Sequence, residues 1–169
     1  PDSFIPGQFE NPANPAAHRA TTGPEIWEDT GGEVDVFVAG IGTGGTRSGI
    51  GETLKAINPQ IEIWAVEPEN AAILAGGTIG THLQMGIGDG LIPDNLNQEI
   101  YDSLYIVTDE EAITTAKDLA RLEGLMCGIS SGTNVAAALK LAKKLGPGKT
   151  VVTVLPDTAE RYFSTPLFE

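Results

Sequence analysis

A glycine-rich turn from Gly40 to Thr46 contains the residues best suited to bind a ligand. It reads Gly-Ile-Gly-Thr-Gly-Gly-Thr and directly follows an apolar, β-branched run. Glycine lets the backbone adopt positive φ and approach a ligand closely. The free N–H groups at the start of a following helix, together with the helix dipole, then attract an anion. The turn therefore predicts a phosphate-binding site.

The phosphate could belong to either of two kinds of ligand. Gly40, Gly42 and Gly45 match the G-x-G-x-x-G spacing of dinucleotide sites. Glu67 ends the next predicted strand, where such sites place a carboxylate that binds ribose. Alternatively, residues 42–46 form a cup in which two threonine hydroxyls join the backbone amides, and this cup suits a terminal phosphate dianion. A glycine turn without a ligand is the third interpretation.

Other reactive side chains favour structural interpretations. His18 and His82 have no cysteine, histidine or carboxylate partners at metal-ligand spacing, so we predict surface residues and no metal site. Cys127 is expected to be a small buried apolar residue rather than a nucleophile. Ser130, taken alone, is typical of a helix N-cap.

Alternating strands and helices must position these residues. A strand over 34–39 runs into the glycine turn, and a helix to about residue 56 and a strand over 61–66 complete a right-handed β-α-β unit. Residues 75–97 are punctuated by glycine and proline and are predicted to be irregular. The remaining predicted elements are helices over 15–29, 109–123 and 133–145 and strands over 104–107 and 150–155. This order predicts an α/β fold with a doubly wound, mostly parallel sheet flanked by helices.

Composition narrows the class of protein further. The 169 residues are 41% hydrophobic and carry a net charge of −13. That charge argues against nucleic acid, because phosphate backbones are bound by lysine and arginine. No apolar run approaches the roughly 20 residues that a membrane-spanning helix needs. A single cysteine fits a reducing compartment. We therefore expect a cytoplasmic protein that binds neither nucleic acid nor membrane.

Several motifs occur in an order that carries a resemblance to a known family. They are Gln-Phe-Glu-Asn-Pro-Ala-Asn-Pro at 8–15, Thr-Thr-Gly-Pro-Glu-Ile-Trp at 21–27, the cup at 42–46, Gly-Ile-Ser-Ser-Gly at 128–132 and Glu-Arg-Tyr at 160–162. Together they resemble the cysteine synthase (O-acetylserine sulfhydrylase) family of fold-type-II enzymes, which use pyridoxal 5'-phosphate (PLP). The resemblance runs from Gln8 to Phe168, and several motifs in agreement are more specific than one glycine loop.

The resemblance implies a PLP site and part of a substrate site. In the family, the equivalents of residues 42–46 cradle the cofactor phosphate, Ser130 hydrogen-bonds the pyridine nitrogen, and Pro156 lies near the ring. Gln8 and Gly86 match residues that hold or line the amino-acid substrate. The cofactor residues implied are Gly42, Thr43, Gly44, Gly45, Thr46, Ser130 and Pro156, and the substrate residues are Gln8 and Gly86.

A serine beside the pyridine nitrogen would have a chemical consequence. A hydroxyl leaves that nitrogen largely neutral, whereas a carboxylate would hold it protonated and make the ring a strong electron sink. The weaker sink suits β-elimination from an activated serine. Met85 and Asp89 depart from the family's pattern in a loop that lines the amino-acid site, which bears on substrate preference.

The family's Schiff-base lysine lies upstream of its Gln-Phe-x-Asn-Pro motif, which begins here at Gln8. The lysines of this chain are predicted on solvated helix faces or in a turn, and they are Lys55, Lys117, Lys140, Lys143, Lys144 and Lys149. We therefore predict that residues 1–169 form the C-terminal, PLP-binding portion of a longer enzyme and contain no catalytic residue of their own.

The resemblance also implies what that longer enzyme does. It would convert O-acetylserine and sulfide to cysteine and acetate, as a homodimer that can bind the C-terminal tail of serine acetyltransferase. Two alternatives stay open. One is a cystathionine β-synthase-like enzyme that adds homocysteine, and the other is a non-catalytic module that binds phosphate or a dinucleotide.

Overall fold

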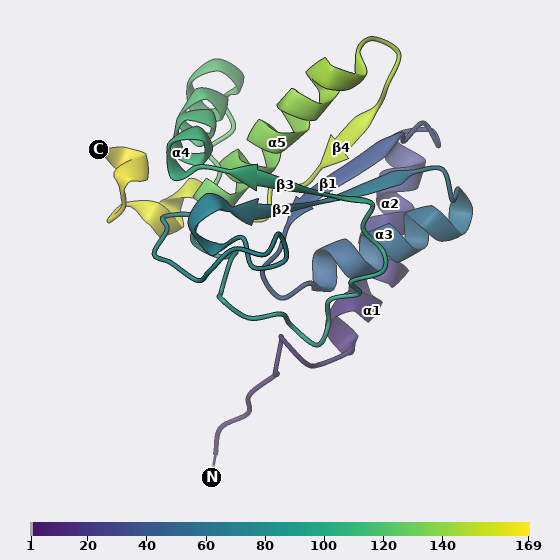
Figure 1. Cartoon of the computed structure of the whole chain (residues 1–169), viewed down its shortest axis with the longest axis horizontal. Coiled ribbons are helices and arrows are strands. Elements are labelled where there is room, and N and C mark those ends of the chain that lie inside the picture. Colours follow the sequence, from purple (N-terminus) through teal and green to yellow (C-terminus); the bar gives the residue numbers. More distant parts are fainter. Residues whose placement is uncertain (1) are drawn as a thin grey trace.

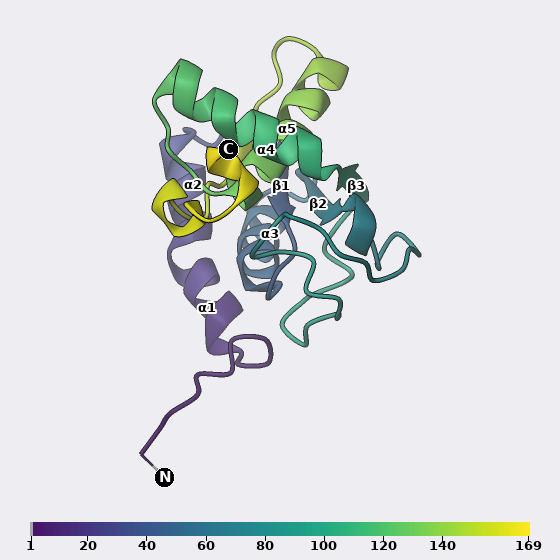
Figure 2. The ribbon, with the colours of Figure 1, turned by 90° about the vertical axis from the view of Figure 1, so that its left-hand side faces the viewer.

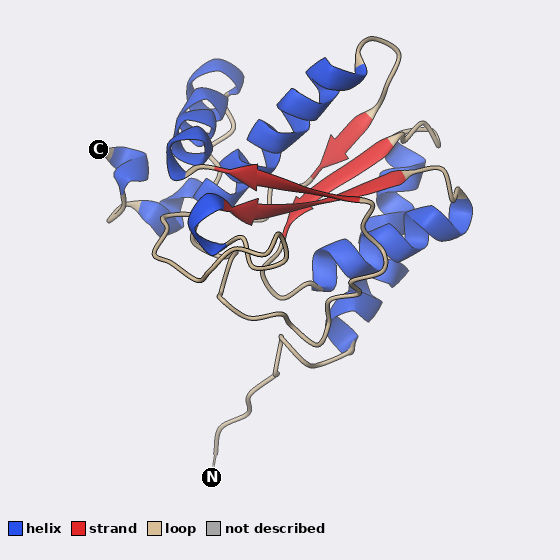
Figure 3. Cartoon of the chain, viewed as in Figure 1, coloured by secondary structure: helices blue, strands red, loops and turns tan. Residues whose placement is uncertain are grey.

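A four-stranded parallel sheet forms the centre of the computed structural model, which describes residues 2–169. Its order is β3-β2-β1-β4, and each neighbouring pair of strands is parallel. The strands are β1 (Val36–Gly40), β2 (Glu62–Pro68), β3 (Ser103–Val107) and β4 (Val151–Thr153). Figure 3 shows helices on both sides of this sheet. The predicted α/β fold is confirmed.

Two groups of helices bury the two faces of the sheet (Figures 1 and 2). They are α1 (Ala13–Ala20), α2 (Thr22–Asp29) and α3 (Gly45–Ile57) on one face, and α4 (Asp109–Asp118) and α5 (Ile129–Leu145) on the other. Successive strand residues point to opposite faces. In β1, Phe37 packs in the core on the α3 side and Val38 in the core beneath α5. The first strand is therefore buried on both faces, as its continuous apolar run predicts.

The helix predicted over 15–29 is in fact two helices. The chain leaves helical geometry at Thr21, where φ is −126° and ψ is −72°. The break lets the start of α2 press against α3, because a Cβ on Gly23 would lie 2.7 Å from the Cβ of Thr53. Contact with a neighbouring helix thus overrides a helical pattern that is continuous in the sequence.

The two later helices also differ from their predicted bounds. The helix predicted over 109–123 is an α-helix as far as Asp118 and continues as a π-helical turn from Leu119 to Glu123. Its start follows the prediction, since Thr108 and Glu111 form a reciprocal capping box with two 3.2 Å hydrogen bonds. The helix predicted over 133–145 begins earlier, at Ile129. This earlier start matters because it places Ser130 inside the helix.

The long connection between β2 and β3 has no helix or strand after Ala71, in agreement with the irregular segment predicted there. It runs past the carboxyl ends of the strands (Figure 3). Within it, the Gly88 N–H donates to the carbonyl of Ile41 at 2.9 Å, so the connection is tied to the glycine turn. Among residues 2–169, no helix is both long and apolar enough to span a membrane.

Candidate functional site

A cavity of about 360 Å³ lies at the carboxyl ends of β1 and β4. Ligand sites of parallel α/β sheets occur at this edge. The cavity wall brings together most of the residues singled out from the sequence, namely Gln8, Gly42, Thr43, Gly44, Thr46, Gly86, Ser130 and Pro156. Gly45 is the one predicted residue outside the wall. Segments separated by more than a hundred positions in the sequence therefore meet at one site.

The glycine turn offers backbone donors to this cavity. Within residues 2–169, no protein acceptor binds the N–H groups of Gly42, Thr43, Gly44 and Thr46. The flanking N–H groups are used by the fold, since Ile41 donates to the carbonyl of Val66 at 3.2 Å and Ser48 donates to that of Gly44 at 3.0 Å. The free donors are thus confined to the residues that line the cavity, at the positive end of the α3 dipole.

Tight packing by the protein itself explains why these positions are glycine. A Cβ on Gly42 would lie 2.5 Å from the carbonyl oxygen of Gly86, and a Cβ on Gly45 would overlap the side-chain amide of Asn14. Gly44 has a φ of 79°, which side chains other than glycine rarely adopt. Positive φ and close approach to a ligand, the reasons expected from the sequence, are therefore joined by a third, since contacts with the loop at Gly86 and with α1 also require glycine.

Side chains from α1 hold the two threonine hydroxyls of the turn. The Asn14 amide donates to Thr43 Oγ1 at 2.9 Å and to the Gln8 carbonyl at 2.8 Å. The ring of His18 hydrogen-bonds Thr46 Oγ1 through Nε2 at 3.2 Å. His18 is half-buried, and burial lowers the pKa of its ring, so the prediction of a plain surface residue is wrong. Asn14 and His18 therefore hold the two threonine side chains of the cup in place.

Ser130 is the second residue of α5 and is only 4% exposed. The N-cap of the helix is Gly128, so the N-cap interpretation of Ser130 is wrong. Gly128 takes that position because its N–H donates to the Asp157 carbonyl at 3.1 Å, and a Cβ there would overlap the Asp157 carboxylate. The Ser130 hydroxyl has no hydrogen bond within residues 2–169, which leaves it available to a ligand in the cavity.

Asn134 was not recognised from the sequence. It lies one turn after Ser130 and lines the cavity. Its Oδ1 accepts from the Gly40 N–H at 2.8 Å, and its Nδ2 donates to the Val154 carbonyl at 2.9 Å. It thus joins the end of β1 to the chain that leaves β4. An asparagine inside an alanine-rich helix is intrinsically unfavourable, and this was the signal that could have identified it.

The structure argues against a dinucleotide site, because groups expected to bind the dinucleotide form hydrogen bonds within the protein instead. Glu67 is 4% exposed, and its two carboxylate oxygens accept from the N–H groups of Leu74 (2.9 Å) and Ala75 (3.0 Å). The carboxylate therefore serves the fold and is absent from the cavity wall. The N–H of Gly40 is likewise taken by Asn134. What remains is the compact cup at 42–46, which favours a terminal phosphate.

The opposite wall of the cavity is formed by the chain after β4. Pro156 and Asp157 line it together with Tyr162. The Tyr162 hydroxyl donates to Asp157 Oδ2 at 2.6 Å, while Asp157 Oδ1 is buried without a partner within residues 2–169. Burial and the neighbouring Asp157 raise the pKa of Tyr162 well above its usual value, so the phenol stays protonated at neutral pH. Sequence reasoning also missed this pair.

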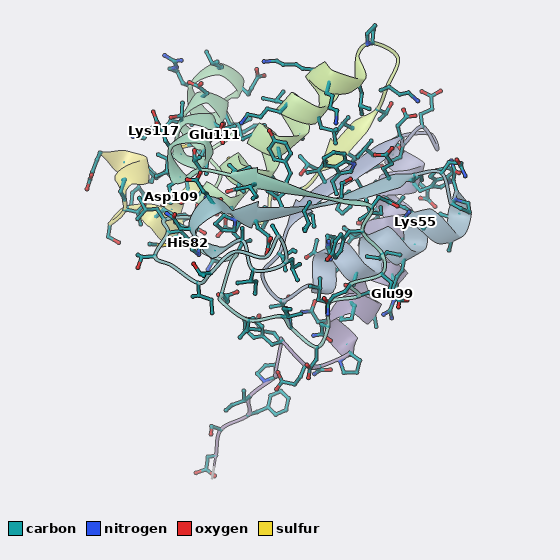
Figure 4. The ribbon with its side chains drawn as sticks, in the orientation of Figure 1. Lys55, His82, Glu99, Asp109, Glu111 and Lys117 are labelled. Carbon is teal, nitrogen blue, oxygen red and sulfur yellow. The ribbon has the colours of Figure 1, made fainter. Side chains whose placement is uncertain are left out.

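No lysine of residues 2–169 lines the cavity. Lys55 pairs with Asp102 at 2.8 Å, and Lys117 donates to the Glu169 carbonyl at 3.1 Å. Figure 4 shows these two lysines on α3 and α4, well apart from each other. His82 hydrogen-bonds the carbonyl of Gly88 at 3.0 Å and thus stabilises the loop instead of lying free on the surface. In the same residues, no cluster of histidine, cysteine or carboxylate side chains could hold a metal ion.

Comparison with known proteins identifies the class that this fold and site define. Residues 1–157 match the family model described as "Pyridoxal-phosphate dependent enzyme". The chain belongs to that family. It is 53% identical over 166 residues to a cysteine synthase of Staphylococcus aureus (strain N315), an alignment that covers 98% of this chain and 54% of the relative. The chain thus spans about half the length of the curated relatives it matches.

Two solved structures show the same arrangement. An O-acetyl serine sulfhydrylase (isoform 3) from Entamoeba histolytica is 44% identical with a TM-score of 0.94, covering 98% of this chain and 49% of that one. An O-acetylserine dependent cystathionine beta-synthase from Helicobacter pylori is also 44% identical, with a TM-score of 0.91, covering 100% of this chain and 55% of that one. Both the fold and the resemblance to fold-type-II PLP enzymes are therefore confirmed.

The residues of the cavity fit PLP, the cofactor of this family. Its phosphate needs several donors, and the turn at 42–46 has backbone N–H groups that the protein leaves free. Its pyridine nitrogen needs one polar partner, and the unpaired hydroxyl of Ser130 faces the same cavity. A volume of about 360 Å³ lies in the usual range for a small-molecule site.

Proposed function

We propose that this chain forms the PLP-binding half of an enzyme that converts O-acetylserine and sulfide to cysteine and acetate. The observation that carries the proposal is the joint presence, in one cavity, of free backbone donors at 42–46 and the free hydroxyl of Ser130. The identity of 53% with a cysteine synthase supports it. The cofactor, when bound, supplies the electron sink for β-elimination.

Each residue of the cavity has a distinct task in this proposal. Residues 42–46 bind the phosphate and so fix the position of the cofactor. Ser130 hydrogen-bonds the pyridine nitrogen and keeps it largely neutral, which limits the sink to what β-elimination needs. Gln8 and Gly86 line the side on which the amino acid binds, and Pro156 bounds the ring. The Schiff-base lysine comes from the part of the relatives' length that these residues do not span.

We extend the proposal to assembly and location. The full-length enzyme is a homodimer in the cytoplasm, and it binds the C-terminal tail of serine acetyltransferase. A second candidate function is the addition of homocysteine, which is favoured by the likeness to the cystathionine beta-synthase from Helicobacter pylori. The two candidates share their first half-reaction, the release of acetate, and differ only in the nucleophile that follows.

Steady-state rates for both nucleophiles test this proposal. In the full-length protein with O-acetylserine, we expect kcat/KM for sulfide to exceed that for homocysteine by about tenfold or more, equivalent to about 1.4 kcal/mol of transition-state binding. The isolated chain of residues 1–169 serves as the control and should show no turnover. Faster formation of cystathionine would select the second candidate, and no product with either nucleophile would reject both.

A further inference from the structure

Arg47 is a buried cation without a counter-ion. It lies in the first turn of α3, directly after Thr46, and its exposed fraction is 0%. Within residues 2–169, its Nε, Nη1 and Nη2 atoms have no hydrogen-bond partner. Its guanidinium lies over the ring of Tyr101, whose centroid is 4.5 Å from Cζ. A desolvated charge held in this way lowers the stability of the fold, so its presence calls for another explanation.

Nearby acidic groups do not neutralise Arg47 by contact. Glu67 attracts the guanidinium through space, but its carboxylate oxygens already accept from the backbone of Leu74 and Ala75. Burial lowers the pKa of Arg47 to about 10, partly offset by Tyr101 and Glu67, so the group stays charged at neutral pH. The positive charge therefore acts on its surroundings through a medium that screens it poorly.

The cup at residues 42–46 lies close in the chain to this charge. Arg47 lines the same cavity as Gly44 and Thr46 and adjoins Thr46 in the chain. The protein as a whole carries a net charge of −13, which repels an anionic ligand. A buried cation carried by the first turn of α3 opposes that repulsion close in the chain to the free N–H groups of the turn. The helix dipole there has the same sign.

We propose that Arg47 is an electrostatic part of the phosphate cradle, which strengthens binding of the cofactor's phosphate dianion without touching it. This inference rests on the proposed function, since it takes the ligand of the cup to be PLP. Arg47 thereby lowers the stability of the fold and raises the affinity of the cup for an anion. Its role is specific to the phosphate, and this specificity separates it from a residue that merely holds the fold together.

Paired titrations of the full-length apoprotein with PLP and with pyridoxal, which lacks the phosphate, test this role. Arg47→Met keeps a long side chain but removes the charge. We expect it to weaken PLP binding about tenfold, the order for one poorly screened charge near a dianion, and to change pyridoxal binding less than about twofold. The thermal midpoint of the apoprotein should stay the same or rise, because an unpaired buried charge is gone.

A matched control removes a charge that solvent screens. Arg19→Met, on the neighbouring helix α1, loses an exposed cation that pairs with Glu52, and it should leave both affinities within about twofold of wild type. Should Arg47→Met not fold, Arg47→Gln allows the same comparison. Equal losses for PLP and pyridoxal, or no loss for either, would overturn the role of Arg47. A wild-type protein that does not distinguish PLP from pyridoxal would overturn the phosphate site itself.

Discussion

Replacing Gly45 with alanine in the full-length enzyme is expected to abolish retention of PLP and to lower the free energy of unfolding. The new Cβ would overlap the Asn14 side chain, which holds Thr43 Oγ1 and the Gln8 carbonyl. Overpacking of this kind costs about 1–3 kcal/mol, and each hydrogen bond broken adds about 1 kcal/mol. Thermal melting and the PLP content after dialysis measure the two effects.

Two further variants separate the overlap from the general effect of alanine in this helix. Gly51→Ala lies in the same helix, where the three atoms nearest to a Cβ would be side-chain atoms of Ile100 and Ile63 at 3.3–3.5 Å, so a small change in stability is expected. In Gly45→Ala combined with Asn14→Ala, stability should recover in part, while PLP retention should not, because Thr43 has lost its anchor. Gly45→Ala with wild-type melting and full PLP content would contradict the account of the cup.

Ser130→Ala in the full-length enzyme should slow the release of acetate from O-acetylserine by about tenfold to a hundredfold. This is the range for a lost hydrogen bond worth about 1.5–3 kcal/mol to a group that gains charge in the transition state. Stability should change little, because the hydroxyl has no hydrogen bond within residues 2–169. Ser130→Asp should be slower still in overall β-replacement, because a carboxylate favours a protonated ring. Rapid-quench measurement of acetate gives the first rate directly.

The neighbouring serine provides the control for Ser130. Ser131 is 0% exposed and also lacks a hydrogen-bond partner within residues 2–169, but it does not line the cavity. Ser131→Ala should therefore leave acetate release unchanged. If Ser130→Ala and Ser131→Ala behaved alike, or if Ser130→Asp kept wild-type rates, Ser130 would have no part in the cofactor site.

The parts of the site that local sequence determines were predictable. A β-branched run such as that around Phe37, followed by the glycines of 42–46, specifies a strand, a turn and a helix from neighbouring residues alone. The capping box at Thr108 and Glu111 is local in the same way. The position of the cup at the edge of the sheet can therefore be predicted from these elements without reference to distant contacts.

The remaining features depend on residues far apart in the chain. Gly128 caps α5 because Asp157, almost thirty positions later, occupies the space a side chain would need. Glu67 matches a ribose-binding carboxylate by position, yet a later turn uses both of its oxygens. Arg47 belongs to a residue type that is usually exposed, and contacts with residues distant in the chain, such as Tyr101, bury it. Patterns within a short window contain none of this information.

The central claim is that residues 42–46 hold the cofactor phosphate. The ionisation state of the bound phosphate is its most direct test. Phosphorus NMR of the PLP-loaded full-length enzyme would follow the phosphate resonance from about pH 5.5 to 8, across the second ionisation of a free phosphate monoester near pH 6. Several N–H donors stabilise the dianion and lower its pKa, so we predict the dianion resonance throughout this range. A resonance that titrates near pH 6, as in free solution, would contradict the claim.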